Sequence, residues 1–204
     1  IAQGTEMDPE AAKFYNAGNK MMKSGNYAGA LEQYDNALKT STDYRINYQK
    51  GVTLKKLKKY TEAEQALQAS LSSNSDFAIG YNAIGGIYFV TGQYTKAIDA
   101  FINFEKLSTK ENLKKKANEY IARSYAKLGA NAKTDGKYDE AITHLLNSVK
   151  YFNYDAAYLT LAEVYVENGD YSKALEAADK ALNYRKSISK GGPLYYKGLA
   201  FKKN

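Results

Sequence analysis

The chain has 204 residues, a net charge of +7 and no cysteine, which excludes disulfides and thiolate metal sites. It has 20 tyrosines and two prolines, and no run of residues is apolar enough to span a membrane. The basic excess is confined to the end, because residues 180–204 carry seven lysines and arginines and no acid, whereas the preceding residues balance.

The N-terminal residues allow two interpretations. Ile1–Gly4 is either the start of a mature chain after removal of a signal peptide or a cloning remnant ahead of Met7. The tyrosine- and asparagine-rich, cysteine-free composition favours an exported or periplasmic bacterial protein over a cytoplasmic one. Asp8 then predicts a helix start, because its carboxylate can accept unpaired amide hydrogens and Pro9 suits the first turn.

A tyrosine three residues ahead of an alanine recurs at intervals of 33, 34, 44 and 33 residues. The five pairs are Tyr27 and Ala30, Tyr60 and Ala63, Tyr94 and Ala97, Tyr138 and Ala141, and Tyr171 and Ala174. A small residue lies nine positions before each tyrosine. A glycine lies two positions before it, except in the second repeat, where Lys58 takes that place. This period predicts stacked helix–turn–helix units, in which the small residue allows close helix packing and the glycine ends the first helix.

The 44-residue interval predicts one longer helix. Leu113, Ala117, Ile121 and Leu128 keep a continuous helical spacing, so we expect the extra residues to lengthen the first helix of the fourth repeat at its start by about 15 Å. We expect this extension to project beyond the neighbouring helices. Capping boxes are predicted at residues 61–64 and 108–111, where a hydroxyl residue precedes a glutamate by three positions.

The pattern resembles the tetratricopeptide repeat (TPR) family, whose first helix carries an aromatic residue, a Leu-Gly pair and a second aromatic residue. The third repeat matches this pattern well, with Tyr81, Ile84, Gly85, Tyr88, Ala97, Phe101 and Phe104. The resemblance covers roughly residues 11–186 and implies an all-α, right-handed α-solenoid, as a single domain over residues 1–204. The expected repeats are residues 11–43, 44–77, 78–107, 108–154 and 155–186, and the expected capping helix is residues 191–202.

The family's first helices line a concave groove, so the resemblance implies a protein–protein interaction scaffold that binds a peptide or partner helix. The residues at groove positions of this sequence are Tyr15, Asn16, Asn19, Arg45, Tyr48, Gln49, Asn82, Phe89, Arg123 and Lys127. Tyrosines offer contact area with a hydrogen bond, and amides can hold a peptide backbone. Alternatively, these residues form only the solvated face of the scaffold.

The family's carboxylate clamp, which holds acidic C-terminal tails of heat-shock chaperones, is not expected here. The matching positions hold Tyr15, Asn19, Gln49, Ile79 and Ala83. Only Asn19 agrees with the clamp, and without the cations the charge-assisted bonds to a carboxylate are lost.

Catalysis is not expected either. The single histidine, His144, has no nucleophile at a supporting spacing, and no HExxH or EF-hand pattern is present. Gly85 and Gly86 lie within a predicted helix and lack a phosphate-loop pattern. We therefore expect no enzyme, cofactor or metal, and the absence of a groove-reading motif argues against nucleic acid as a partner.

Two alternatives to groove binding remain. In the first, the chain is an assembly subunit that associates, with itself or with other proteins, through its ends or its long fourth-repeat helix. In the second, its basic C-terminal stretch binds an anionic partner or a membrane surface. A solvated last helix explains that charge more simply.

Overall fold

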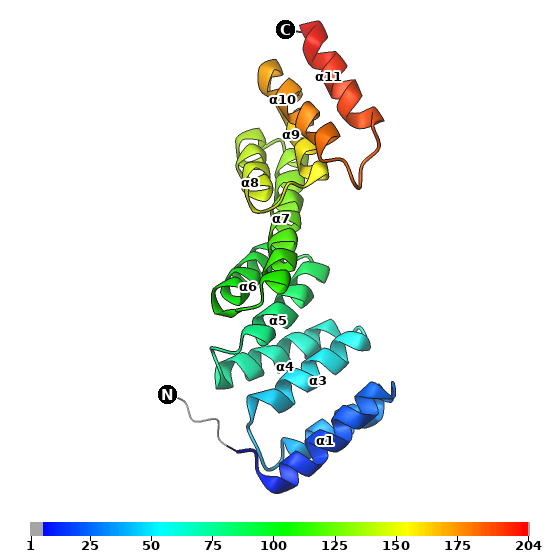
Figure 1. The fold of residues 1–204 in the computed structure, drawn as a ribbon, viewed down its shortest axis with the longest axis vertical. Helices are drawn as coiled ribbons and strands as arrows, with labels where there is room; N and C mark the ends of the chain where they lie inside the picture. The colour runs from blue at the N-terminus through cyan, green and yellow to red at the C-terminus, as the bar shows by residue number, and fades with distance from the viewer. Residues whose placement is uncertain (1–5, 204) are drawn as a thin grey trace. The chain divides into compact units, whose positions relative to one another are not determined.

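The computed structural model describes residues 6–203 and contains, within that range, eleven α-helices and no β-strand (Figure 1). The Ile1–Gly4 segment lies outside the described residues. The helices are α1 (Pro9–Lys23), α2 (Tyr27–Ala37), α3 (Tyr44–Lys56), α4 (Tyr60–Ser73), α5 (Ala78–Val90), α6 (Tyr94–Leu107), α7 (Glu111–Thr134), α8 (Tyr138–Tyr151), α9 (Asp155–Glu167), α10 (Tyr171–Asn183) and α11 (Gly191–Lys203). The predicted all-α helical-repeat fold is confirmed.

The helices divide into two compact units. The N-terminal unit comprises residues 6–93 and 103–109, and the C-terminal unit comprises residues 94–102 and 110–203. Helix α1 pairs with α2 and α3 with α4 in the first, while α7 pairs with α8 and α9 with α10 in the second. The description of residues 1–204 as a single domain stays a prediction.

The turns between paired helices use the residues that the sequence singled out. Gly25, Gly92, Gly136 and Gly169 have φ values between 72° and 81°, which only glycine adopts without strain. Lys58 takes the same left-handed conformation, with φ of 59°, at the one repeat that lacks the glycine. The turn geometry is therefore kept in that repeat despite an unfavourable residue.

In the first, second and fourth repeats, the small residue of the first helix permits close packing where the second helix crosses it. A Cβ added at Gly51 would lie 2.7 Å from Cγ of Leu67, and one at Gly129 would lie 2.6 Å from Cγ of Leu145. At Gly18 it would lie 2.6 Å from the ring of Tyr34. Carbon atoms do not approach so closely without repulsion, so these positions have no room for a side chain.

Of the three predicted helix caps, one forms and two do not. Asp8 caps α1, accepting from the amides of Glu10 and Ala11 at 3.1 and 3.0 Å. The capping boxes at residues 61–64 and 108–111 do not form, because α4 and α7 start from Lys59 and Lys110 without a side-chain cap. At α4 the reason is the turn itself: the amide of Lys59 still bonds to α3, so the next helix follows at once.

Helix α7 contains 24 residues, against 13 in α9, and the extra residues precede Gly129. The expectation that they project beyond the neighbouring helices is wrong for the second half of the extension. Ala117 and Ile121 are fully buried, and the ring of Tyr120 stacks on Phe101 at 5.3 Å. Because apolar residues recur at helical spacing along this stretch, it packs within the C-terminal unit.

Candidate peptide-binding site

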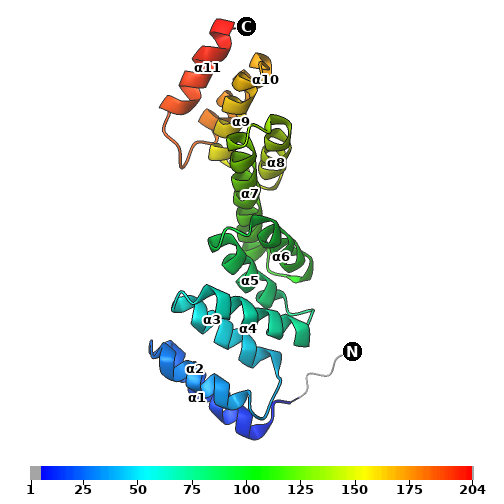
Figure 2. The ribbon, with the colours of Figure 1, turned by 180° about the vertical axis from the view of Figure 1, so that it is seen from behind.

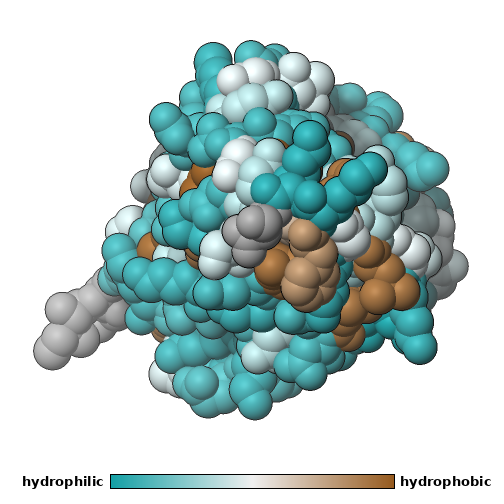
Figure 3. All heavy atoms as spheres, turned by 90° about the horizontal axis from the view of Figure 1, so that it is seen from above, coloured by the Kyte–Doolittle hydropathy of each residue, from teal (hydrophilic) through white to brown (hydrophobic). Residues whose placement is uncertain are grey.

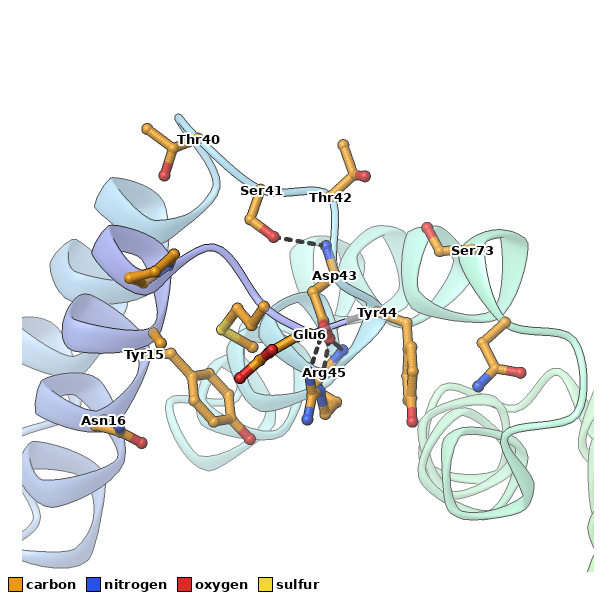
Figure 4. A pocket seen from close by; sticks show the side chains of 14 residues that line it. Glu6, Tyr15, Asn16, Thr40, Ser41, Thr42, Asp43, Tyr44, Arg45 and Ser73 are labelled. Atoms are coloured by element: carbon orange, nitrogen blue, oxygen red, sulfur yellow. Dashed lines mark hydrogen bonds and ion pairs between the residues drawn. The ribbon is translucent and has the colours of Figure 1, made fainter. Parts of the chain in front are cut away.

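The N-terminal unit contains a pocket of about 1410 Å³, bordered by the start of α1, the connection from α2 to α3, and the end of α4. Its lining residues are Glu6, Met7, Pro9, Ala12, Tyr15, Asn16, Thr40, Ser41, Thr42, Asp43, Tyr44, Arg45, Ser73 and Asn74. Figure 4 shows Tyr15 and Asn16 on α1 facing Tyr44 and Arg45 across this space. Three predicted groove residues, Tyr15, Asn16 and Arg45, therefore meet here.

Arg45 is held in place by Asp43, the residue that caps α3. The Arg45 side chain donates from Nε to Oδ1 at 2.9 Å and from Nη2 to Oδ2 at 2.6 Å, while its backbone amide donates to Oδ1 at 2.9 Å. Burial opposes ionisation of Asp43, yet the bonds from Arg45 keep the pKa of its carboxyl below the ordinary value. The same hydrogen bonds raise the pKa of Arg45. A guanidinium has five N–H donors, so the remaining ones are available to a ligand.

The connection that forms one wall is shaped by local hydrogen bonds. The hydroxyl of Ser41 accepts from the amide of Asp43 at 3.2 Å. The backbone amide of Ser41 in turn donates a hydrogen bond to the carbonyl oxygen of Ala37 at the end of α2. These bonds fix residues 40–43 as a short polar rim beside α1.

Several other groove candidates serve the packing of the N-terminal unit. Asn19 accepts a hydrogen bond of 2.8 Å from the hydroxyl of buried Tyr34, and burial raises the pKa of Tyr34 to about 12. Tyr48 packs edge-on against Phe77 with ring centroids 5.0 Å apart, and burial raises its pKa as well. Neither Asn19 nor Tyr48 lines the pocket.

The remaining candidates lie elsewhere. Gln49 on α3 and Asn82 and Phe89 on α5 are half-buried and do not line the pocket. Arg123 and Lys127 belong to α7 of the C-terminal unit, where Lys127 is exposed.

Arg123 has a defined environment of its own. Its Nη2 donates to Glu119 at 2.5 Å, and its Cζ lies 5.9 Å from the ring centroids of both Tyr120 and Tyr154. One nitrogen of the guanidinium is therefore engaged in an ion pair and two aromatic rings flank the group, which makes Arg123 a packing residue as much as a binding one.

The sequence did not single out the pocket residues outside the first helices. Thr40, Thr42, Ser73 and Asn74 come from helix ends and connections. The family resemblance identifies groove residues only in the first helix of each repeat, so it gives no information about these helix ends and connections. One available signal was Asp43 two residues ahead of Arg45 at a helix start, where a carboxylate can both cap the helix and hold the cation.

Residues 6–203 contain no group of three histidine, cysteine or acidic side chains placed to hold a metal ion. His144 is half-buried, with Nε2 3.7 Å from a carboxylate oxygen of Glu140. No helix in this range is both long and apolar enough to cross a membrane.

Comparison with solved structures supports the helical-repeat fold. YrrB, described as a TPR protein with an unusual peptide-binding site, has a TM-score of 0.64 and 19% identity, covering 92% of each chain. MamA (residues 41 to the end) from Desulfovibrio magneticus RS-1 has a TM-score of 0.57 and 18% identity, covering 90% of this chain and 99% of that one. The P58(IPK) TPR domain has a TM-score of 0.56 and 19% identity, covering 94% and 55%. At these identities, the likeness concerns the fold alone.

A search of curated proteins gave no match. The sequence profile of the tetratricopeptide repeat matches residues 48–103 and 126–190, which together exceed half of the chain. With its paired helices, turn glycines and small residues at the helix crossings, the chain belongs to the tetratricopeptide repeat family.

Proposed function

We propose that the protein is a non-catalytic interaction scaffold that binds an extended peptide segment in the pocket of the N-terminal unit. The observation that carries this proposal is the convergence of Tyr15, Asn16 and Arg45 on one space of about 1410 Å³. Membership of the TPR family supports a protein-interaction scaffold in general, and YrrB is described as having a peptide-binding site.

The chemistry of the lining fits a peptide backbone. Asn16 and Asn74 have amide groups that both donate and accept, as a backbone requires. Tyr15 and Tyr44 add aromatic surface with hydroxyls. Arg45 adds N–H donors whose direction is fixed by Asp43. Such groups can form hydrogen bonds with the backbone carbonyl oxygens that a peptide presents at regular spacing.

The charge of the lining selects the kind of segment. Two carboxylates, from Glu6 and Asp43, face a single guanidinium, that of Arg45, which is already paired. An acidic tail would meet no uncompensated cation here, so the segment is neutral or basic. This distinguishes the proposed ligand from the acidic tails that a carboxylate clamp holds.

A displayed library of random peptides, selected on the purified protein, tests the proposal. Affinities of the enriched peptides are then measured by fluorescence anisotropy. Asn16→Trp fills the pocket from an exposed position, and we expect binding to weaken by about tenfold or more. Because the chain has no tryptophan, this variant also reports on the pocket by its fluorescence.

Glu32→Trp is the matched control, since Glu32 is exposed on α2 in the same unit and does not line the pocket. It should bind like the wild type. Equal binding by both variants, or enrichment of acidic peptides, would contradict the proposal. The two earlier alternatives, assembly through the long α7 and attachment through the basic end, stay predictions; a basic-end contact should weaken steeply with salt.

A further inference from the structure

Helix α11 has the layout of the first helix of a repeat. It carries Lys197 and Gly198 where α3 carries Lys50 and Gly51, and both helices begin seven residues before that glycine and end five residues after it. Helix α11 packs on α10 and α9, as α3 packs on α2 and α1 (Figures 1 and 2). The repeat pattern therefore continues into the last helix of the chain.

The difference is that nothing covers the glycine of α11. In α3, a Cβ at Gly51 would lie 2.7 Å from Cγ of Leu67 and 3.2 Å from the carbonyl oxygen of Ala63, both on α4. Leu145 and Ala141 of α8 approach Gly129 in the same way, at 2.6 and 3.2 Å. At Gly198, no atom would lie within 4 Å of an added Cβ.

The residues one turn to each side of Gly198 are apolar and exposed. Leu194 is 53% exposed and Phe201 is 63% exposed, whereas Leu54, which matches Phe201 in α3, is 2% exposed beneath α4. The opposite side of α11 holds buried Pro193 and Ala200. Most of the surface visible in Figure 3 is hydrophilic. We call Leu194, Gly198 and Phe201 the open face of α11.

Charge around the open face indicates the character of its occupant. Lys202 and Lys203 lie in the last turn of α11, residues 180–204 contain no acidic residue, and Asp179 is paired with Lys197 at 2.5 Å. Two α11 helices packed together would bring these lysines close to like charges. An acidic helix would instead be attracted, and its carboxylates would meet the C-terminal lysines.

We propose that the open face of α11 binds an acidic amphipathic α-helix of a partner protein, in the place that α4 takes on α3. The bound helix has an alanine whose backbone crosses Gly198 and a leucine four positions later, as Ala63 and Leu67 have in α4. Its apolar stripe covers Leu194 and Phe201. This is a second interaction surface, independent of the pocket in the N-terminal unit.

The probe for this surface is a synthetic peptide with the sequence of residues 60–73. It contains Glu62 and Glu64, no basic residue, and the Ala63 and Leu67 pair. A hydrocarbon staple between positions 65 and 69, both exposed in α4, keeps the peptide helical. We expect saturable binding of the labelled peptide to the full chain by fluorescence anisotropy, and no binding of the peptide that carries Leu67→Glu.

Gly198→Leu is the decisive variant. Because nothing lies within 4 Å of this position, the new side chain leaves the fold intact while it blocks the approach of a helix. We expect an unchanged or higher melting temperature and binding weakened by about tenfold or more. Ser172→Leu, which adds the same side chain at an exposed position of α10, should bind like the wild type.

Three results would overturn the proposal. One is no saturable binding up to about 1 mM protein. Another is equal binding by wild type and Gly198→Leu. The third is concentration-dependent self-association, measured by sedimentation, that is lost in Gly198→Leu, because the occupant is then a second copy of the chain. Asn16→Trp should bind the stapled peptide normally, so failure of the pocket and failure of the open face are distinguishable.

Discussion

The hydroxyl of Ser148 on α8 donates a buried hydrogen bond of 2.7 Å to the carbonyl oxygen of Ala122 on α7. Ser70 on α4 does the same to the carbonyl oxygen of Tyr44 on α3, at 2.8 Å. The two residues of each bond are 26 positions apart, and the Ser70 bond lies within the N-terminal unit while the Ser148 bond lies within the C-terminal unit. A side chain near the end of the second helix thus bonds to the first helix of the same repeat, at the residue seven positions before Gly51 or Gly129.

Replacing Ser148 by alanine should lower the free energy of unfolding by about 1 kcal/mol, the usual net value of one internal hydrogen bond. Urea denaturation followed by far-UV circular dichroism measures the change. Ser172→Ala, at an exposed position of α10, is the control and should have little effect. A Ser148→Ala protein as stable as this control would mean that the bond is replaced by water at no cost.

Gly51 and Gly198 should respond in opposite directions to alanine. At Gly51 the new methyl group would lie 2.7 Å from Leu67, so Gly51→Ala should destabilise the protein by about 1–3 kcal/mol. At Gly198 the methyl group enters open space, and Gly198→Ala should stabilise α11 by roughly 1 kcal/mol through helix propensity alone.

Thermal denaturation of the two variants side by side measures this difference, and each is the control for the other. A stabilising Gly51→Ala would show that α3 and α4 can separate at little cost. A strongly destabilising Gly198→Ala would show that another group already covers the open face of α11.

Much of the fold was predictable because its determinants are local. A glycine with positive φ and a small residue at a helix crossing both leave a mark at a fixed place in the sequence, so Gly136 and Gly129 could be recognised without coordinates. The capping box at residues 61–64 does not form although its residue pattern is present. The tight turn at Lys58 sets where α4 begins, before Thr61 can act as a cap.

The candidate site was predictable only in part. Tyr15, Asn16 and Arg45 were found because they occupy first-helix positions that the family pattern identifies. Asn74 was not, because its contribution depends on how a helix end approaches a neighbouring repeat. Asn19 looked equivalent to Asn16 in sequence, yet its side chain bonds to Tyr34. Which polar residue faces a pocket and which joins two helices is decided by packing.

Lys58 offers a direct test of turn strain. It is held at φ of 59°, where a β-carbon clashes with the backbone, in the position that glycine occupies in the other repeats. Lys58→Gly should therefore raise the free energy of unfolding by about 1 kcal/mol. Lys59→Gly, at a φ of −84°, relieves no strain and should not stabilise the protein. Equal effects of the two changes on urea denaturation would contradict this account.

Asp155 fastens the segment between α10 and α11. Its carboxylate, 3% exposed, accepts from the amides of Lys186 and Ser187 at 2.6 Å, from the hydroxyl of Ser187 at 2.6 Å and from the amide of Ile188 at 3.2 Å. Burial favours the neutral form, but these donors outweigh it and lower the pKa of Asp155 from 3.8 to about 2. The ionised carboxylate is thus the form that holds the segment leading into α11 at the start of α9.

This lowered pKa predicts a pH-dependent contribution to stability. Since the carboxyl of Asp155 binds protons more weakly in the folded state than in the unfolded state, its contribution is complete above about pH 4 and is lost as the pH falls towards about 2. At neutral pH the contribution is about 2 kcal/mol. Asp155→Asn should therefore be less stable than the wild type by this amount at pH 7, and the difference should shrink on acidification.

Hydrogen exchange of the α11 amides, together with urea denaturation at several pH values, measures where the effect acts. Asp135→Asn, at an exposed position after α7, should behave like the wild type at every pH and so corrects for the general effect of removing a charge. If Asp155→Asn loses the same stability at acid and neutral pH, ionisation of this carboxylate is not what anchors the segment. If only the α11 amides exchange faster, α11 opens separately while α9 and α10 stay folded. Apart from the amide of the adjacent Ala156, the donors to the Asp155 carboxylate all belong to residues 186–188, between α10 and α11.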